Sequence, residues 1–161
     1  MIKAASWNVR GLNGLDHQRA VEQLVSDHKL TFIGLIETRV SQVNVQRVRR
    51  NLLLNWSWFD DYAGPEGRIW LAWNPLEVGV DILRVESQFV HCRAFNKRLH
   101  TRCLITVLYG AYDLIPRRNL WSALCNLSAV TLNEPWLVLG DFNAVMDDSE
   151  VHGEQRILVL R

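Results

Sequence analysis

The sequence predicts an α/β fold of the mixed (α+β) type in a single domain. Segments with apolar residues at helical spacing alternate along the chain with short runs rich in aromatic and β-branched residues. The length of 161 residues suits one domain with a sizeable core. The composition, with 48% hydrophobic and 22% charged residues, is typical of a folded globular protein.

The first third of the chain predicts two strands and two helices. Residues 2–9 alternate as a short strand does and run into a glycine-containing loop. Residues 16–28 have helical spacing, and Asp16 is the expected N-cap. Residues 31–36 form a continuous apolar run, as in a strand that is buried on both faces. Residues 43–54 again have the spacing of a helix.

The middle of the chain predicts a β-rich region, and a helix and a strand follow it. Turn signals stand at residues 64–67 and 74–75. A helix is expected at 117–130, with Pro116 near its first turn, and the last strand at 136–139. The strands expected between the second and third helices span residues 56–62, 68–73, 78–85, 89–95 and 102–109.

The formal net charge of +1 excludes the global attraction for nucleic acid that a strongly basic domain shows. Local clusters of basic residues are expected to be solvated faces. They comprise Arg47, Arg49 and Arg50; Arg93, Lys97, Arg98 and Arg102; and Arg117 with Arg118.

Cysteine usage and hydropathy predict an intracellular protein, nuclear or cytoplasmic, that does not enter a membrane. Cys92, Cys103 and Cys125 are odd in number and widely spaced, which indicates neither a disulfide framework nor a zinc site. No apolar stretch has the length of a membrane span, and the first residues lack the hydrophobic segment of a signal peptide.

Polar side chains stand at the ends of several predicted strands. Asn8, Glu37 and Tyr109 each end an apolar run, and Asp141 and Asn143 follow the last one. In α/β sheets, ligands bind beyond strand ends. Carboxylate and amide oxygens, without a cluster of His or Cys, favour Mg²⁺ or Mn²⁺ over zinc. The pattern therefore predicts a metal-assisted site for phosphoryl chemistry.

Each of these residues also has an ordinary structural interpretation when it is taken alone. Asn8 is suited to capping the loop at Gly11, and the segment 141–143 is suited to an Asx turn. Tyr109 is compatible with a packed aromatic ring whose hydroxyl bonds to the backbone. A structural role is harder to assign to Glu37, because a buried carboxylate without a partner is unfavourable.

Four motifs, in this order, resemble the endonuclease/exonuclease/phosphatase family, which has the DNase I-like fold. They are Ser6-Trp7-Asn8-Val9-Arg10-Gly11, Ile36-Glu37-Thr38, Thr106-Val107-Leu108-Tyr109 and Gly140-Asp141-Phe142-Asn143. Residues 8–12, 67–73 and 117–121 look most like the endonuclease region of plant LINE-type (non-LTR) retrotransposons.

The resemblance implies a partial four-layer αββα sandwich, in which two mixed β-sheets pack face to face between helices. It also implies roles for the strand-end residues. Glu37 would be the main ligand of Mg²⁺ (or Mn²⁺), and Asn8 would lie close to the metal and the scissile phosphate. Asp141 would assist proton transfer, Asn143 would orient phosphate or water, and Tyr109 would steady the phosphoryl oxygens.

The sequence departs from the family's pattern after residue 150. The family's terminal Ser-Asp-His motif is not found before Arg161, and His152 comes too early to be its histidine. We therefore expect residues 1–150 to be the N-terminal part of the family's domain and residues 151–161 to be a divergent tail. Whether such a chain has enzymatic activity is left open by the sequence.

Two further departures lie closer to the predicted site. Many relatives have an Asn three residues after the tyrosine, where this chain has Tyr112. Arg68 stands where many plant relatives have a second glycine. The first departure could remove a phosphate contact, and the second alters the turn before Ile69.

The sequence favours a Mg²⁺-dependent DNA endonuclease domain fragment derived from a retrotransposon. DNA is the expected partner, with a downstream reverse transcriptase in the ancestral element. One alternative is a phosphatase of the same superfamily that acts on sugar or inositol phosphates. Another is a non-catalytic remnant that binds nucleic acid through residues 47–50 and exposed tryptophans.

Overall fold

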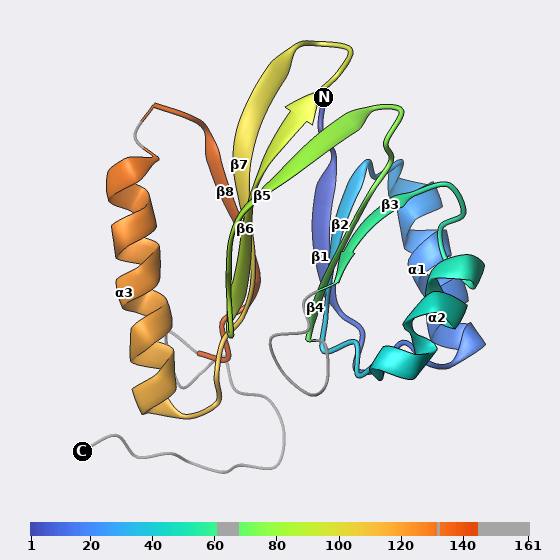
Figure 1. Cartoon of the computed structure of the whole chain (residues 1–161), viewed down its shortest axis with the longest axis horizontal. Coiled ribbons are helices and arrows are strands. Elements are labelled where there is room, and N and C mark those ends of the chain that lie inside the picture. Colours follow the sequence, from blue (N-terminus) through green and yellow to red (C-terminus); the bar gives the residue numbers. More distant parts are fainter. Residues whose placement is uncertain (61–67, 132, 145–161) are drawn as a thin grey trace.

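Two four-stranded sheets pack face to face in the computed structural model, and helices cover their outer sides (Figure 1). The structure describes residues 1–60, 68–131 and 133–144. Helices α1 (Leu15–His28) and α2 (Val45–Asn51) lie on the first sheet, and α3 (Leu114–Val130) lies on the second. The expected α/β fold and its layered arrangement are confirmed.

The first sheet has the strand order β1-β2-β4-β3. Strand β1 is parallel to β2, and β4 pairs antiparallel with both β2 and β3. Every residue of β2 is buried, as its continuous apolar run predicts. The bounds are β1 Ala4–Asn8, β2 Phe32–Ile36, β3 Ser57–Asp60 and β4 Ile69–Trp73.

The second sheet has the order β5-β6-β7-β8. Its first three strands form an antiparallel meander, and β8 returns beside β7 in parallel, with Asp141 paired to Tyr109. This parallel return requires a crossover, which α3 provides. The bounds are β5 Val78–Glu86, β6 Phe89–Asn96, β7 Thr101–Tyr109 and β8 Trp136–Asp141.

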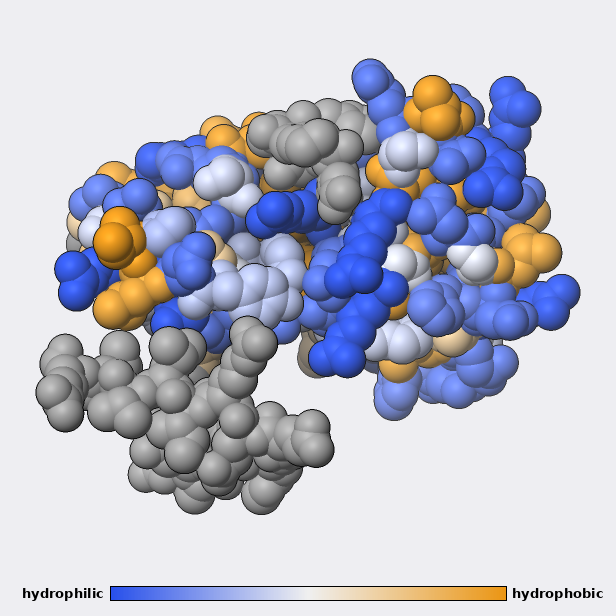
Figure 2. All heavy atoms as spheres, turned by 90° about the horizontal axis from the view of Figure 1, so that it is seen from below, coloured by the Kyte–Doolittle hydropathy of each residue, from blue (hydrophilic) through white to orange (hydrophobic). Residues whose placement is uncertain are grey.

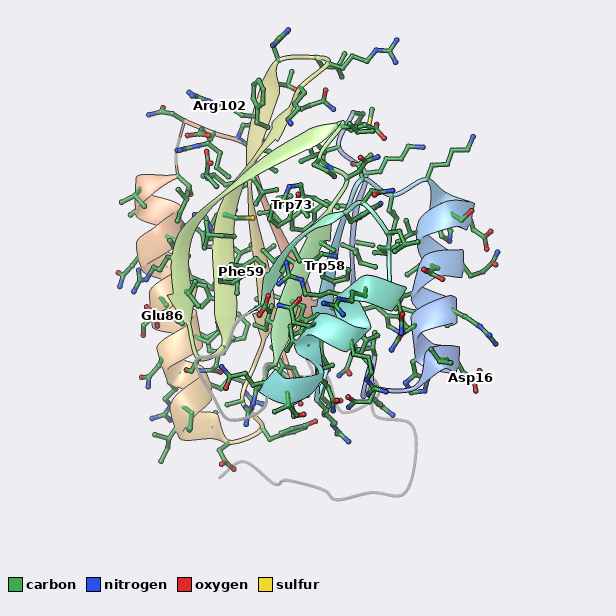
Figure 3. All side chains as sticks on the ribbon, turned by 45° about the vertical axis from the view of Figure 1, so that its right-hand side comes forward. Asp16, Trp58, Phe59, Trp73, Glu86 and Arg102 are labelled. Carbon is green, nitrogen blue, oxygen red and sulfur yellow. The ribbon has the colours of Figure 1, made fainter. Side chains whose placement is uncertain are left out.

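Three apolar layers hold the sandwich together, one between the sheets and one beneath each helical layer. The alternation of side chains along a strand feeds two of these layers at once. On β3, Trp58 packs with the residues beneath α1 and α2, whereas Phe59 packs into the core between the sheets (Figure 3). The turn expected at residues 64–67 lies outside the described residues.

The helix boundaries correct three expectations. Gly14, not Asp16, is the N-cap of α1, and Asp16 lies in the first turn. The second helix is shorter than residues 43–54, because Leu52 takes an extended conformation and is fully buried; a 3₁₀ turn, η1 (Gln42–Asn44), precedes it. Helix α3 begins at Leu114, since a proline in the first turn removes no helical hydrogen bond.

Gly34 allows strands β2 and β7 of the two sheets to approach each other closely. A Cβ atom on this residue of β2 would lie 2.6 Å from Cγ1 of Val107 on β7, which is itself fully buried. Gly34 precedes Glu37 by three residues, and Val107 precedes Tyr109 by two. Because residue 34 has no side chain, the two strands lie close together, and so do Glu37 and Tyr109 at their ends.

Gly34→Ala is expected to lower the free energy of unfolding by about 1–3 kcal/mol, as overpacking of a close-packed core does. Chemical denaturation followed by circular dichroism measures this. Gly79→Ala is the matched control, because its Cβ would lie 3.8 Å from Lys97 Cε, an ordinary contact. Equal stabilities of the two variants would contradict the close approach of the sheets.

Candidate active site

Strands of both sheets end at the same end of the sandwich, at the bottom of Figure 1. Asn8 is the last residue of β1, and Glu37 directly follows β2. Tyr109 and Asp141 are the last residues of β7 and β8, which are neighbours in the second sheet. Figure 2, which views this end, shows hydrophilic side chains gathered in a strip across the middle of the face.

Two hydrogen bonds join the sheets at this point. The Tyr109 hydroxyl donates to Oε1 of Glu37 at 3.0 Å, and Nδ2 of Asn8 donates to Oδ2 of Asp141 at 3.3 Å. Each bond pairs a residue of the first sheet with a residue of the second. The structure therefore brings together four residues that lie up to 133 positions apart in the sequence.

Asn143 joins the same group through the loop that follows β8. Its backbone N–H donates to Oδ1 of Asp141 at 2.9 Å, and its Nδ2 donates to the carbonyl of Gly110 at 2.6 Å. The Asx turn is therefore present, as the structural interpretation of this segment predicts. Asp141 Oδ2 nevertheless faces Asn8, so the turn also holds the carboxylate toward the first sheet.

Asn8 makes two hydrogen bonds, one within its own loop, as its structural interpretation predicts, and one to the second sheet. Its Oδ1 accepts the backbone N–H of Arg10 at 3.2 Å, which caps the loop after β1. Its Nδ2 meets Asp141 across the gap between the sheets. Since the amide oxygen is committed to the loop, the amide nitrogen is fixed toward the second sheet.

Several site residues have sparsely populated backbone conformations. Glu37 has a φ of 57°, and Asn143 has a φ of 47°. Arg10 and Arg39, which flank the strand ends, are also in the left-handed region, with φ of 47° and 51°. Such conformations are unfavourable for residues other than glycine and concentrate at functional sites.

The Glu37 carboxyl group is stabilised in its charged form. Burial raises its pKa, but hydrogen bonds from Arg39 and Tyr109, the positive charge of Arg39 and a hydrogen bond from Asn8 outweigh this effect. The resulting pKa lies below its ordinary value. Glu37 is therefore an anion at neutral pH, as a ligand for a cation must be.

Tyr109 is held in its neutral form. Burial raises the pKa of its phenol, as do hydrogen bonds with Tyr112 and Glu37 and the negative charge of Glu37. A neutral phenol retains its proton and donates it in a hydrogen bond. Tyr109 therefore acts as a donor in this site and is not a candidate for a general base at neutral pH.

Arg39→Ala is expected to raise the pKa of Glu37, because Nη2 of Arg39 lies 2.8 Å from Oε1 of Glu37. The pKa would be measured by NMR titration of the ¹³C-labelled carboxyl group in metal-free protein. Arg19→Ala is the control, since among the described residues the ion pair of Arg19 is with Asp16, at 4.0 Å, and not with Glu37. An unchanged or lowered Glu37 pKa in the Arg39 variant would contradict this arrangement.

A cavity of 380 Å³ opens beside Glu37. Carboxylate, phenol and guanidinium groups share it, a combination suited to a metal-bound phosphate ester. The lining residues are Glu37, Arg39, Arg68, Tyr109 and Tyr112.

The sequence predicted no contact within the site for three residues that shape it. Arg39 pairs with Glu37, and the Tyr112 hydroxyl lies 3.1 Å from the Tyr109 hydroxyl, to which it donates because the Tyr109 proton is committed to Glu37. Nη1 of Arg117 donates to the carbonyls of Asn143 and Tyr112, and so connects the loops after β7 and β8. The position of Arg39 in the loop after Glu37 was an available signal, whereas Arg117 is brought in by the folding of α3.

The basic clusters are only partly the solvated faces that were expected. Arg93 forms a two-pronged contact with Glu134, with distances of 3.1 Å from Nε and 2.8 Å from Nη2, and Arg102 lies 3.5 Å from the same carboxylate. Arg49 pairs with Asp60 at 3.2 Å. These arginines connect structural elements of the protein.

The donor set fits a hard divalent cation. Within residues 1–60, 68–131 and 133–144, no three His, Cys, Asp or Glu side chains are grouped to enclose a metal. Mg²⁺ needs no such cage, because it is commonly held by one or two carboxylates, with water and substrate phosphate completing its shell. Glu37, whose side chain is 12% exposed, offers a shielded but accessible carboxylate, with Asn8 beside it.

Cys92 is buried, Cys103 is half-buried and Cys125 is exposed, and all three are free thiols. Of the helices in the described part of the chain, none has both the length and the apolar character that a membrane crossing requires.

The sequence pattern of the endonuclease/exonuclease/phosphatase family matches residues 5–160. The chain belongs to this family. Members of the family are typically metal-dependent. No curated protein sequence matches the chain.

Solved structures of the same fold resemble the chain at low sequence identity. The endonuclease domain of TRAS1, a telomere-specific non-LTR retrotransposon, has a TM-score of 0.66 at 12% identity, covering 90% of this chain and 60% of that one. A mannosyl-6-phosphatase of Bacteroides thetaiotaomicron has a TM-score of 0.64 at 16% identity, covering 92% of this chain and 68% of that one. An AP endonuclease of Archaeoglobus fulgidus has a TM-score of 0.62 at 16% identity, covering 95% of this chain and 62% of that one.

These likenesses confirm the DNase I-like fold. The chain spans 60% to 68% of the length of the three solved structures.

Proposed function

We propose that this member of the endonuclease/exonuclease/phosphatase family supplies the first part of a Mg²⁺- or Mn²⁺-dependent phosphodiesterase domain that cuts DNA. The observation that carries the proposal is the meeting of strand ends from both sheets. Hydrogen bonds between Tyr109 and Glu37 and between Asn8 and Asp141 place a carboxyl group and a hydrogen-bond donor from each sheet at one gap.

Glu37 is proposed as the ligand of the cation, with Asn8 beside it. A bound Mg²⁺ or Mn²⁺ would neutralise the charge of a phosphodiester and so lower the barrier to attack by water. The lowered pKa of Glu37 favours the charged form of the ligand, and the small exposed fraction of its side chain limits competition by water.

Asp141 is proposed as the residue that handles the proton at the attacking water or at the leaving oxygen. Its Oδ1 is held by the Asn143 N–H, and its Oδ2 faces Asn8. Asn143 and Tyr109 would then orient the phosphate, since Tyr109 keeps its phenolic proton and can donate to a phosphoryl oxygen.

The finer origin of the chain is also a proposal. Residues 8–12, 67–73 and 117–121 support descent from a plant LINE-type retrotransposon, in which a reverse transcriptase would follow the endonuclease. On this interpretation residues 1–150 are domain and 151–161 are tail, and the protein acts in the nucleus or cytoplasm. His152 and the tail lie outside the described residues.

A plasmid-nicking assay tests the proposed function. Purified protein is incubated with supercoiled plasmid in Mg²⁺, with EDTA as the control, and we expect Mg²⁺-dependent conversion to open circles. Absence of nicking, together with retained binding of DNA, would favour the non-catalytic remnant and contradict the proposed enzyme.

The cavity favours a second candidate function. Its 380 Å³ could hold a sugar or inositol phosphate, as a phosphatase of the same superfamily would require. Phosphate release from inositol phosphates, measured in parallel with nicking, separates the two candidates. Release without nicking would replace the nuclease by the phosphatase.

A further inference from the structure

Arg68 and Tyr112 both line the cavity beside Glu37, although they are 44 positions apart in the sequence. Arg68 directly precedes β4 in the first sheet, and Tyr112 lies in the loop between β7 and α3. A guanidinium group and an aromatic ring from different elements therefore meet at one cavity.

Tyr112 is positioned as an open aromatic surface. Its hydroxyl is bonded to Tyr109 at 3.1 Å, and the two rings meet edge to face, with centroids 6.3 Å apart and planes at 90°. Its backbone carbonyl accepts a hydrogen bond from Nη1 of Arg117 at 3.3 Å. The residue nevertheless remains 67% exposed. A ring that is anchored at its hydroxyl and open to solvent can stack on a planar group at little cost in conformational entropy.

Arg68 brings a charge that is not neutralised within the described residues. Arg39, on the same cavity, is paired with Glu37, but Arg68 is exposed and has no hydrogen-bond or ion-pair partner among residues 1–60, 68–131 and 133–144. A guanidinium group binds phosphate through two parallel N–H donors, which makes it the preferred side chain for this anion.

We propose that Arg68 and Tyr112 form a nucleotide-binding wall of the cavity. Arg68 binds a phosphate of the polynucleotide backbone, and Tyr112 stacks on an unpaired base next to it. This inference rests on the proposed function and assigns to the site a single-stranded or locally unpaired nucleic acid. Stacking on an aromatic ring tolerates any base, so the wall binds without strong sequence preference.

Binding in EDTA tests this wall separately from catalysis. A fluorescein-labelled single-stranded oligonucleotide is titrated with wild-type protein and variants, and fluorescence anisotropy gives the dissociation constant. Arg68→Ala is expected to weaken binding about tenfold, as loss of a charge-assisted phosphate contact does. The slope of the logarithm of the association constant against the logarithm of the salt concentration should also decrease in magnitude by about 1.

Arg98→Ala is the matched control for charge. Arg98 is exposed in the turn between β6 and β7, whereas the candidate site lies where β7 ends, and the substitution removes the same charge. It should leave the dissociation constant within about twofold of the wild type, because a distant surface charge contributes little at physiological salt. An equal effect of Arg68→Ala and Arg98→Ala would overturn the assignment of Arg68.

Two substitutions of Tyr112 separate stacking from its bond to Tyr109. Tyr112→Phe keeps the ring and should bind like the wild type, whereas Tyr112→Ala should weaken binding about five- to tenfold. On an oligonucleotide without bases, Tyr112→Ala should have no effect. The stacking role would be overturned if Tyr112→Phe and Tyr112→Ala weakened binding equally, or if Tyr112→Ala weakened binding to the abasic oligonucleotide.

The outcome for this wall is distinguishable from that for the proposed function. If the wild-type protein nicks plasmid in Mg²⁺ but the Arg68 and Tyr112 variants bind the oligonucleotide with unchanged affinity, the proposed function is sustained and the wall is overturned. If the variants lose affinity in EDTA as predicted but the wild-type protein does not nick plasmid in Mg²⁺, the wall is sustained and the proposed enzymatic function is contradicted. Wild-type protein that does not bind the oligonucleotide would overturn the wall. Circular dichroism of each variant confirms that it is folded.

Discussion

Glu37→Gln is expected to reduce Mg²⁺-dependent phosphodiester hydrolysis by about 10²- to 10³-fold, the loss that several kcal/mol of charge stabilisation represents. Glutamine has nearly the same shape, and its amide oxygen can still accept the hydrogen bond that Tyr109 donates to Oε1 of Glu37. The negative charge alone is removed. The variant should therefore fold normally but bind the cation weakly.

Rates measured over a series of Mg²⁺ concentrations test this expectation. The variant should need far more Mg²⁺ to reach its maximum rate. Glu77→Gln is the control, because Glu77 is exposed in the turn between β4 and β5, whereas Glu37 follows β2 at the end where β4 begins. Nicking by the Glu37 variant with the wild-type dependence on Mg²⁺ would contradict the assigned ligand.

Asp141→Asn is expected to lower the maximum rate by about 10²- to 10⁴-fold, the usual contribution of a general acid or base. The loss should persist at saturating Mg²⁺, because an amide neither accepts nor releases the proton. A modest loss of stability, about 1 kcal/mol, should accompany it. The reason is that the new amide group can oppose the Asn8 amide, which now donates to Oδ2 of Asp141.

Single-turnover nicking at saturating Mg²⁺ measures the effect of Asp141→Asn on the chemical step. Asp81→Asn is the matched control, since Asp81 is an exposed residue of β5, an edge strand of the second sheet. Nicking rates within twofold of each other for the two variants would contradict a role of Asp141 in proton transfer.

The candidate site could be predicted from the sequence because its residues stand where apolar strands end. The pattern around Asn8, Glu37, Tyr109 and Asp141 is local, and each strand carries its own terminal side chain to the same end of the sandwich. The structure shows that these four side chains form two pairs across the sheets. Which residues pair depends on how the sheets pack, and the sequence does not show this.

Residues that act through long-range packing escaped prediction. Arg117 belongs to α3, and only the crossover from β7 to β8 brings its guanidinium group to Asn143. Tyr112 was recognised as a departure from the family, but its bond to Tyr109 depends on a loop conformation that no local pattern specifies.

The fold was predicted well where burial determines the element and less well at helix ends. Strand β2 is recognisable because all its residues are buried. The end of α2 was not, since Leu52 fits a helical pattern in the sequence but leaves the helix to fill the core. Similarly, Asp16 is a good N-cap residue, yet Gly14 occupies that position.

The proposed site for a divalent cation is formed by residues that are distant in the sequence. The most direct test is the anomalous scattering of Mn²⁺ in crystals of the protein grown with MnCl₂. We predict a peak in coordination contact with a carboxylate oxygen of Glu37, on the side of Asn8, that disappears in Glu37→Gln. A Mn²⁺ peak found only at other carboxylates, or a peak at residue 37 that persists in Glu37→Gln, would contradict Glu37 as the metal ligand.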